Sequence, residues 1–404
     1  MSLIVQKYGG SSVKNVERIR SVAQRVARYR SKGHKLVVVV SALGDTTDEL
    51  LDLVSQITEE PSDREMDMLL STGEQVSVAI LAIALHKLGH EAISFTGSQV
   101  GIITDTSHGK ARILEINADR IKQELKKGKI VIVAGFQGIN LDQDITTLGR
   151  GGSDLTAVAL AQTLGADCCE IFTDVEGVYN ADPRVVKDAK KINQISYDEM
   201  LEMASLGAQI MQSRSLEMAK KFDVPIHVRS SYSNKLGTMI IKEAKNMEDV
   251  VVRGITINKN EAKITICDVP DRPGIAAKIF KTLADNSVNV DMIVQNVSHT
   301  RRTDISFTVP KTSAAKAEKI TRKITGNIGA GGVIVDTNIA RISIVGVGMK
   351  SHPGVAAKMF EILARKKVNI EMISTSEISI SCIINKKSAE TALKAVHGKF
   401  NLSK

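Results

Sequence analysis

The sequence of 404 residues contains no tryptophan, and aromatic residues make up only 3% of it. Proteins that bind single-stranded nucleic acid stack bases on aromatic side chains, so this scarcity argues against such a surface. No apolar run reaches the roughly 18 residues that a membrane-spanning helix requires. Lys7 interrupts the first apolar run, which is unlike a secretory signal peptide. We therefore expect a soluble, cytoplasmic protein.

Cysteine is also scarce, with only four residues in the chain. The adjacent Cys168 and Cys169 lie in an apolar run and would point to opposite faces of a strand. Neither they nor Cys267 and Cys382 form a C-x-x-C pattern for zinc or redox chemistry. We expect reduced, structural thiols and no resident metal site.

Composition is otherwise ordinary for a globular protein, at 43% hydrophobic and 25% charged residues. The chain is long enough for two or three domains, each with its own core. The net charge of +9 suits acidic ligands but more often serves solubility. The densest basic stretch, residues 16–35, places Ile19, Val22 and Val26 on one helical face, which leaves its arginines on the solvated side. We expect no nucleic-acid or membrane partner.

Through about residue 240, strand-like runs rich in β-branched residues alternate with helical patterns. This alternation predicts an α/β fold with a mostly parallel sheet covered by helices on both faces. Ligands in such folds bind beyond the carboxyl ends of the strands. The predicted strands are LIVQ, KLVVVVS, EAISF, KIVIVAG, CCEIFTDV and PIHVRSS, and the predicted helices lie near 15–32, 46–59, 63–88, 117–127, 153–165 and 207–222.

The C-terminal part contains an internal repeat, because residues 271–297 resemble residues 351–377. Each copy has a strand, a Pro-Gly turn that opens a helix, and a second strand that begins at a Val-Asn pair. Two copies of one small unit are expected to pack together, within the chain or between chains. The predicted domains are 1–245, 246–335 and 336–404, with the leading strand of the second assignable to the third.

The loop after the first strand, KYGGSS, has two interpretations. It is a turn whose Ser12 or Asn15 caps the next helix. Alternatively, the backbone of Gly9 and Gly10 approaches phosphates closely, since glycine has no Cβ, and Lys7 neutralises a transferring phosphoryl group. The sequence of the loop alone does not decide between them.

Helix capping is a competing explanation for the polar residues of two later motifs. In SALGDTTDELL, Thr46 or Thr47 could cap the following helix. In STGEQ, Ser71 and Glu74 fit the S-x-x-E capping box, which is the favoured explanation of Glu74 from sequence.

The glycine-rich loop TLGRGGSD precedes a strongly apolar segment, which Ser153 or Asp154 would cap. Capping does not explain Arg150, whose forked guanidinium suits bidentate capture of a carboxylate or phosphate. In TDVEGVYNADPR, Asp174 and Asp182 are either turn residues or nucleotide-positioning residues.

Six of these strings, KYGGSS, SALGDTTDELL, REMDMLLSTGEQ, FTGSQVGI, TTLGRGGSD and TDVEGVYNADPR, occur in one order. In that order they closely resemble the aspartate kinases of the amino-acid kinase family, and the tandem repeat resembles their pair of ferredoxin-like ACT (βαββαβ) regulatory domains. The resemblance covers essentially the whole chain, and the chain length is similar to that of the monofunctional type.

The resemblance implies phosphoryl transfer from ATP, carried with Mg²⁺, to the β-carboxylate of L-aspartate. This is the first step of lysine, threonine and methionine biosynthesis. Physical chemistry agrees: a carboxylate with a pKa of about 3.9 is already ionised at neutral pH, so no general base is needed. Positioning and charge neutralisation are needed instead, and the motifs supply them.

The resemblance also implies a role for individual residues. Lys7 and Asp154 would be catalytic, with Arg150 gripping the α-carboxylate of aspartate and Glu74 its ammonium group. Ser41, Thr47, Gly151 and Ser153 would complete the substrate pocket. The expected nucleotide-binding residues are Lys7, Tyr8, Gly9, Gly10, Thr173, Asp174, Tyr179, Asp182, Arg184 and Gln209. Gln209 departs from the family, which commonly has lysine there; Arg214 or Lys220 could compensate.

The implied regulation is feedback inhibition by lysine, threonine or both through the ACT units, which would pair in a homo-oligomeric dimer or tetramer. Met247 lies where some relatives start a separate regulatory subunit. The expected effector-binding residues are Asp271, Gly274, Ile275, Ala276, Asn289, Asp291, Gln295, Asn369 and Ile370.

Two alternatives stay open. One is a related kinase for another amino acid, such as glutamate 5-kinase, against which REMDMLLSTGEQ and the paired ACT units count. The other is a catalytically silent amino-acid sensor, which Gln209 favours and the retention of Lys7, Glu74, Arg150 and Asp154 disfavours.

Overall fold

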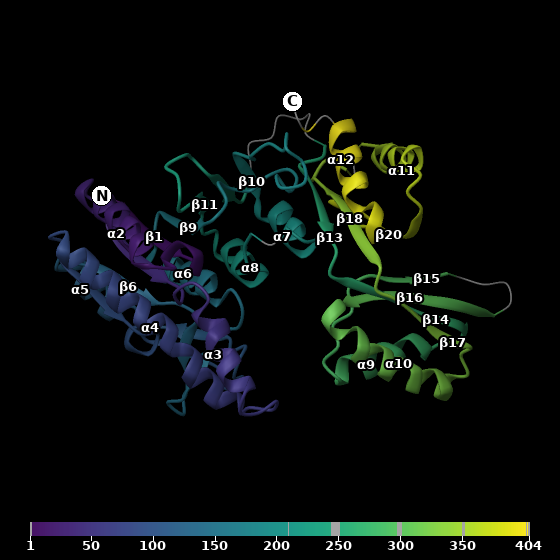
Figure 1. Ribbon diagram of the computed structural model, residues 1–404, viewed down its shortest axis with the longest axis horizontal. Helices are drawn as coiled ribbons and strands as arrows, with labels where there is room; N and C mark the ends of the chain where they lie inside the picture. Colours follow the sequence, from purple (N-terminus) through teal and green to yellow (C-terminus); the bar gives the residue numbers. More distant parts are fainter. Residues whose placement is uncertain are drawn as a thin grey trace. The chain divides into compact units, whose positions relative to one another are not determined.

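The computed structural model describes residues 2–208, 210–243, 251–296, 301–349, 352–400 and 402. The chain forms two compact units, and many of their elements are labelled in Figure 1. The first unit comprises Met1–Val178, Lys191–Ala204 and Gln209–Lys245, and the second comprises Tyr179–Lys190, Ser205–Ala208 and Asn246–Lys404. Met247 lies outside the described residues, so the predicted internal start stays a prediction, as do the predicted domain boundaries.

The first unit is built on an eight-stranded sheet in the order β10-β12-β11-β9-β1-β2-β6-β3. β1 (Leu3–Tyr8) lies near its middle and pairs in parallel with both β2 and β9. Only β12 runs antiparallel to a neighbour, β11, so the predicted mostly parallel α/β fold is confirmed. The other strands are β2 (Lys35–Val40), β3 (Ala92–Phe95), β6 (Ile130–Ala134), β9 (Cys168–Thr173), β10 (Gln194–Ser196), β11 (Ile226–Ser230) and β12 (Thr238–Ile241).

Helices cover both faces of this sheet. Side chains alternate along a strand, so Gln6 and Tyr8 face one side of β1 and Lys7 faces the other. The Tyr8 side packs in one core with α2 (Val16–Ser31) and α4 (Asp63–Lys87), whereas the Lys7 side lies under α6 (Gly152–Leu164). The remaining helices are α1 (Gly10–Val13), α3 (Thr46–Ser55), α5 (Asp119–Lys126), α7 (Tyr197–Ser205) and α8 (Ser213–Phe222), with the 3-10 turn η1 (Ser98–Val100).

A second, smaller sheet of the first unit was not predicted. Its order is β5-β4-β7-β8, and its strands have three or four residues each. Runs this short show no readable alternation, which is why the sequence pattern misses them. Its strands are β4 (Ile102–Thr104), β5 (Ile113–Ile116), β7 (Gln137–Ile139) and β8 (Ile145–Thr147).

Helix α4 is long and apolar enough to cross a membrane by length and composition alone. Its residues Val78, Leu81 and Leu85 are buried in the core against α2 and the sheet. That packing accounts for its apolar composition, as in any core helix.

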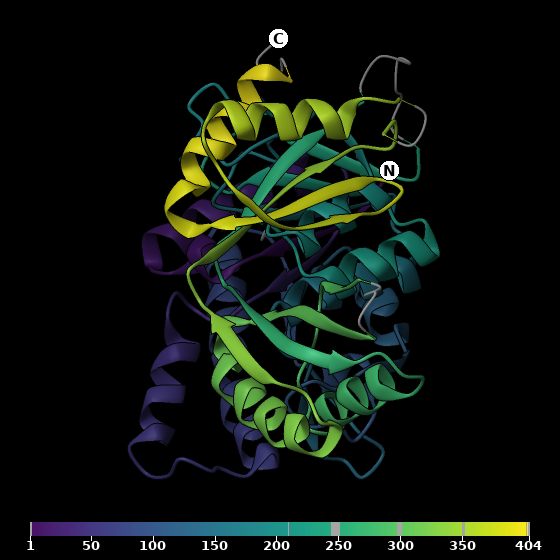
Figure 2. The same ribbon diagram turned by 90° about the vertical axis from the view of Figure 1, so that its right-hand side faces the viewer.

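The second unit contains two four-stranded sheets, each flanked by a pair of helices (Figure 2). The sheet β15-β16-β14-β17 has the predicted ferredoxin-like βαββαβ arrangement, and β13-β18-β20-β19 has the same spatial order with β13 in the place of the last strand. β13 precedes the first repeat along the chain but pairs with β18, in the sheet of the second. The strands are β13 (Gly254–Asn258), β14 (Glu261–Pro270), β15 (Ile293–Gln295), β16 (Arg302–Pro310), β17 (Gly332–Asp336), β18 (Ile339–Val345), β19 (Ile370–Thr375) and β20 (Ser379–Asn385).

Each repeat opens its first helix at the expected Pro-Gly turn. Gly274 and Gly354 precede these helices at φ values of +90° and +96°, which glycine adopts at little steric cost. The helices are α9 (Ile275–Asp285), α10 (Ala314–Ile328), α11 (Val355–Arg365) and α12 (Ala389–Lys399), with 3-10 turns η2 (Lys311–Ser313) and η3 (Lys386–Ser388).

Candidate active site

Lys7 and Asp154 form an ion pair at the carboxyl end of β1. Lys7 Nζ lies 2.6 Å from Asp154 Oδ1, and the two side chains are only 13% and 8% exposed. The chain passes from β1 to its neighbour β2 on one side of the sheet, whereas the neighbour on the other side, β9, comes much later in the sequence. The strand order therefore changes direction between β1 and β9. Open α/β sheets bind ligands at such points.

The loop after β1 places glycine backbone beside Lys7. A Cβ on Gly9 would lie 3.4 Å from Lys7 Nζ, and a Cβ on Gly10 would lie 3.0 Å from the carbonyl oxygen of Gly44. Asn15 accepts a hydrogen bond of 2.9 Å from the N–H of Arg18 and so caps α2. The loop therefore contains a helix cap at Asn15, and it also brings the backbone of Gly9, which has no side chain, close to the ammonium group of Lys7.

The N-terminus of α6 faces the same strand ends. Gly151, at φ +76°, is its N-cap, so the prediction that Ser153 or Asp154 caps the helix is wrong; both lie buried in its first turn. A Cβ on Gly135, just after β6, would lie 2.6 Å from Ser153 Oγ, so that strand end abuts the helix. The N–H groups of a helix N-terminus favour an anion.

Arg150 lies in the loop that leads into α6. Glycines at φ +79° and +76°, Gly149 and Gly151, flank it, and its side chain is exposed. Among the described residues it has no hydrogen-bond or ion-pair partner. The guanidinium is thus available for a carboxylate.

Glu74 is a buried carboxylate with one oxygen unpaired. Helix α4 begins at Asp63, so Ser71 and Glu74 lie in mid-helix and the predicted capping box is wrong; Ser71 Oγ donates to the carbonyl of Met68 instead. Glu74 is 4% exposed, its Oε1 accepts from the N–H of Ala42 at 3.0 Å, and its buried Oε2 has no partner within the described residues. Burial raises the pKa of Glu74 from its usual 4.5 to about 7.

Ser41 and Thr47 belong to the segment after β2, where the N–H of Ala42 binds Glu74. Ser41 directly follows β2, and its N–H donates to the carbonyl of Tyr8 at 3.0 Å. Thr47 is half-buried in the first turn of α3, whose N-cap is Asp45, so neither Thr46 nor Thr47 caps that helix as predicted.

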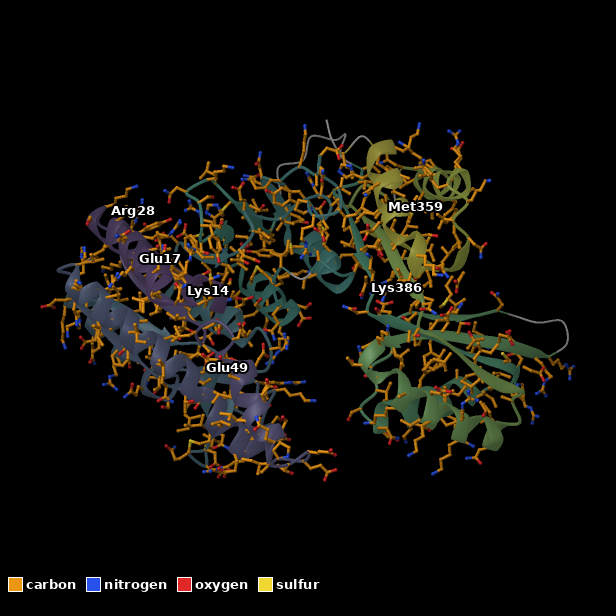
Figure 3. The ribbon with its side chains drawn as sticks, viewed as in Figure 1. Lys14, Glu17, Arg28, Glu49, Met359 and Lys386 are labelled. Atoms are coloured by element: carbon orange, nitrogen blue, oxygen red, sulfur yellow. The ribbon has the colours of Figure 1, made fainter. Side chains whose placement is uncertain are left out.

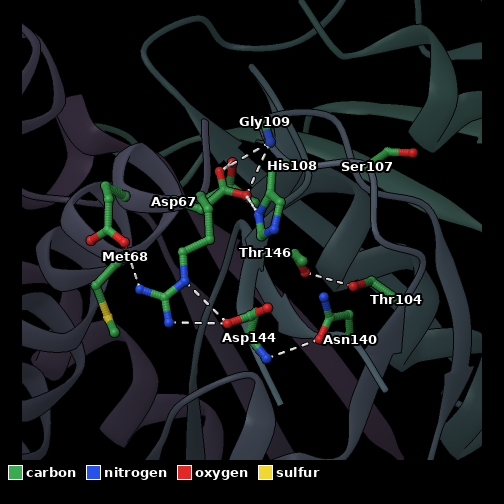
Figure 4. Close-up of polar contacts among 12 residues, drawn as sticks. Asp67, Met68, Thr104, Ser107, His108, Gly109, Asn140, Asp144 and Thr146 are labelled. Carbon is green, nitrogen blue, oxygen red and sulfur yellow. Dashed lines mark hydrogen bonds and ion pairs between the residues drawn. The ribbon is translucent and has the colours of Figure 1, made fainter. Parts of the chain in front are cut away.

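A polar network centred on Asp67 joins helix α4 to the loop at His108 and Gly109 (Figure 4). The fully buried Asp67 accepts from His108 Nδ1 at 2.8 Å, from the N–H of Gly109 at 3.0 Å and from Thr147 Oγ1 at 2.5 Å. Thr147 ends β8, three residues before Arg150. Asp67 therefore ties α4 to the strand that delivers the glycine-rich loop.

Sequence reasoning assigned no role to Asp67. A signal was present, since Asp67, Ser71 and Glu74 form a polar stripe at i, i+4 and i+7 on an otherwise apolar helix face.

The residues expected at the nucleotide are divided between the two units. Thr173 ends β9 in the first unit and Asp174 follows it, and Thr173 Oγ1 donates to Asp174 Oδ1 at 3.0 Å. The Tyr8 ring is fully buried and stacks on Phe172 with centroids 4.6 Å apart, on the sheet face opposite Lys7. Only the backbone of Tyr8 remains for a ligand.

Tyr179, Asp182 and Arg184 belong to the second unit. Asp182 accepts from the backbone N–H and from the guanidinium of Arg184, each at 2.9 Å, and the side-chain bond to Arg184 lowers the pKa of Asp182. These contacts support the turn interpretation of Asp182.

Gln209 lies outside the described residues. Of its two suggested substitutes, Arg214 donates to the carbonyls of Leu148 and Ala111, and Lys220 pairs with Asp198 at 2.5 Å. Both cations are therefore engaged within the first unit.

In the second unit, a cavity of about 330 Å³ opens at the first Pro-Gly turn. Asp271, Gly274, Ile275, Ala276 and Gln295, all predicted effector-binding residues, are among its lining residues. The other four do not line it: Asn289, Asp291, Asn369 and Ile370.

Asp291 instead pairs with Arg341. The guanidinium of Arg341 is buried and lies 2.6 Å from both Asp291 and Glu261, which links the two sheets of the second unit. Burial, partly offset by Arg341, raises the pKa of Glu261 to about 6.

Comparison with known proteins places this geometry in a family. The amino acid kinase family matches residues 2–230, and the ACT domain matches residues 268–323 and 342–400. The aspartate kinase of Pseudomonas putida is 52% identical over 403 residues, which span 100% of this chain and 98% of that protein.

Two solved structures of E. coli aspartokinase III are similar over 98% of this chain and 99% of theirs, at 25% identity. The complex with aspartate and ADP, in the R-state, gives a TM-score of 0.82, and the complex with lysine and aspartate, in the T-state, gives 0.78. With the family models and the full-length relative, they show that the chain belongs to the aspartate kinases of the amino acid kinase family.

Proposed function

We propose that the protein transfers the γ-phosphoryl group of ATP to the β-carboxylate of L-aspartate, giving ADP and 4-phospho-L-aspartate. The observation that carries the proposal is the buried Lys7–Asp154 pair at the reversal point of the sheet, beside glycine backbone and a helix N-terminus. The carboxylate oxygen attacks the γ-phosphorus as the bond to the bridging oxygen of ADP breaks. Because the attacking group is already an anion, the site needs cations and N–H donors rather than a base.

Lys7 is the cation that stabilises the transferring group. Asp154 holds the ammonium of Lys7 in place through a largely buried ion pair, whose two charged atoms lie 2.6 Å apart. The N–H group of Gly10 and the N-terminal end of the α6 dipole add positive potential without a mobile side chain.

Aspartate is held by opposite charges at its α-carbon. Arg150, which has no partner among the described residues, takes the α-carboxylate. The unpaired Oε2 of Glu74 takes the ammonium group, and this contact compensates a carboxylate that is otherwise costly to bury. The walls of the pocket are Ser41, Thr47, Gly151 and Ser153.

ATP binds on the β9 side of the first unit through Thr173 and Asp174, and a role of Tyr179, Asp182, Arg184 and Gln209 in nucleotide binding stays a prediction. Mg²⁺ arrives with the nucleotide. Among the described residues, no group of three His, Cys, Asp or Glu side chains could hold a metal ion, so the phosphate oxygens would supply most of its ligands.

Lysine, threonine or both inhibit the enzyme by binding at the ACT units. Support comes from the cavity at the first Pro-Gly turn and from the similar E. coli enzyme, whose T-state structure contains lysine. Asn289, Asn369 and Ile370 would reach the effector where ACT units of two copies pair, so the protein is a homo-oligomer. It acts in the cytoplasm, and the pathway step is the first towards lysine, threonine and methionine.

A hydroxylamine-trapping assay tests this function. With ATP and Mg²⁺, the purified protein should form the hydroxamate of aspartate and little of glutamate. Preference for glutamate would favour the kinase of another amino acid. Absence of any hydroxamate, with lysine or threonine still bound, would favour the silent sensor.

A further inference from the structure

A second cavity, of about 290 Å³, lies between α2 and the end of β11. The arginines on β11 and on the inner side of α2 belong to the sheet face that Tyr8 shares, opposite Lys7 and Asp154. The site of phosphoryl transfer and this cavity are therefore separated by the sheet itself. The cavity is lined by Arg25, Arg28, Tyr29, Lys32, His34, Arg229 and Asn234.

The lining is strongly cationic. Arg25, Arg28 and Lys32 follow one another at i, i+3 and i+7, so they form one stripe along α2, and Arg229 faces it from β11. One carboxylate, Glu170, lies beneath. Its oxygens accept from Arg229 at 2.9 Å, from the hydroxyl of Tyr29 at 3.0 Å and from the amide of Gln6 at 2.8 Å. Glu170 thus compensates one of four cations.

Arg25 is buried and the side chain of Arg229 is only 12% exposed, and neither cation is fully compensated. Arg25 is 7% exposed, yet within the part of the chain that the structure describes its guanidinium donates only to neutral carbonyls, those of Ser231 at 3.2 Å and Ser233 at 3.0 Å. The Nε of Arg229 is buried and has no acceptor among the described residues. Burying cations in this way is costly unless an anion accompanies them.

The two outer cations are free to reach a ligand. Arg28 projects from α2, as Figure 3 shows, and both it and Lys32 are exposed. Neither side chain has an ion-pair partner among the described residues. A solvated helix face explains Arg28 and Lys32 taken alone, but it does not explain the buried Arg25 and the largely covered Arg229 that line the same cavity.

We propose that this cavity binds a small, multiply charged oxyanion of the phosphate class. Guanidinium groups bind phosphate oxygens through paired, charge-assisted hydrogen bonds, and four cations converge here from two elements. A cavity of about 290 Å³ suits a phosphate-sized group rather than an extended polymer. The guanidinium groups of Arg25 and Arg229 lie 4.9 and 5.7 Å from the ring of Phe172, and that ring stacks on Tyr8 of β1. A bound anion would therefore be connected to β1 through these two arginines and the stacked rings.

Thermal unfolding with inorganic phosphate tests the proposal, with chloride used to hold ionic strength constant. The test variant is Arg28→Gln with Lys32→Gln, both exposed, so folding is preserved. The control is Arg20→Gln with Lys122→Gln, which removes the same charge from exposed positions outside the cavity. Phosphate should raise the Tm of the unmodified protein and of the control along a saturable curve. The test variant should need at least about tenfold more phosphate, as expected for two lost charge-assisted bonds.

Phosphate bound at the catalytic end would stabilise all three proteins alike, so the comparison isolates the cavity. Equal phosphate responses in all three proteins, or no saturable response in the unmodified protein, would overturn the proposal. Stabilisation by a single-stranded oligonucleotide without any by phosphate would also overturn it, since an extended polyanion surface would then be the better description.

Discussion

Glu74 is the side chain whose environment departs most from what the sequence suggested. The S-x-x-E pattern indicated a helix cap, but the helix starts eleven residues earlier, at Asp63. Capping is a local property, whereas the burial of Glu74 depends on how α4 packs beside the loop after β2. A buried carboxylate with an unpaired oxygen is typical of a binding site and unfavourable for folding.

Replacing Glu74 by glutamine should therefore stabilise the fold and weaken aspartate binding. The pKa of Glu74 is raised to about 7 in the folded protein. Its protonated form stabilises the fold at low pH, and this contribution is lost as pH rises from about 4.5 through 7. Above pH 7, the free-energy cost of keeping Glu74 ionised in the folded protein reaches about 3 kcal/mol. Glu74→Gln should raise the free energy of unfolding at pH 8 but scarcely at pH 4, as measured by urea unfolding.

The same substitution should raise the KM for aspartate by at least tenfold, about the loss of one charge-assisted contact. In the unmodified enzyme, kcat/KM for aspartate should rise with pH through about 7, as Glu74 ionises. Glu74→Gln should remove that rise. A variant less stable than the original at pH 8, or one with an unchanged pH profile, would contradict the assigned role.

Asp67 should act as a positioning residue for the Arg150 loop. Asp67→Asn keeps one acceptor oxygen but removes the charge that faces His108, so it should cost about 1–3 kcal/mol of stability. It should also raise the KM for aspartate more than it lowers kcat, because the loop that carries Arg150 loosens. Asp142→Asn, at an exposed position, is the control. Stability loss with an unchanged KM would mean a purely structural role.

Among the elements, those with long periodic patterns were predictable. The runs that form β1, β2, β6 and β9 are buried on both faces and read as continuous β-branched stretches, and α4 was predicted within a residue of its ends. The strands β4, β5, β7 and β8 were missed because each is too short to show a period. Within the site, Lys7 and Gly9 were placed correctly at the end of the first strand, whereas Asp154 lies in the first turn of α6 and not at its cap. The contacts of all three residues depend on pairings between distant segments.

Close packing of the β6 end against α6 makes Gly135 a sensitive position. A Cβ there would lie 2.6 Å from Ser153 Oγ and 2.7 Å from Ser153 Cβ, so Gly135→Ala must displace the first turn of α6, which holds Asp154. It should lower kcat by at least tenfold and destabilise the protein by about 1–3 kcal/mol. Gly398→Ala, where a Cβ meets nothing, should be neutral or slightly stabilising in circular-dichroism melts. Equal kcat values for the two variants would refute the packing argument.

At the scale of the whole molecule, catalysis and regulation should be separable by mutation. Asp271 and Gln295 line the cavity of the second unit, so Asp271→Asn with Gln295→Ala should weaken inhibition by lysine or threonine at least tenfold and leave uninhibited kcat unchanged. Asp285→Asn, on the exposed side of α9, is the matched control. Inhibition curves for each effector, alone and combined, measure the effect. Full inhibition of the cavity variant would place the effector elsewhere.

The account rests on a division of labour in which Lys7 serves the transferring phosphoryl group and Arg150 serves bound aspartate. Steady-state kinetics of Lys7→Ala and Arg150→Ala test it most directly. Lys7→Ala should lower kcat by at least a hundredfold with little change in the KM for aspartate, since the cation acts mainly in the transition state. Arg150→Ala should raise that KM by at least tenfold and lower kcat far less. The opposite pattern, with Lys7 governing KM and Arg150 governing kcat, would contradict the account.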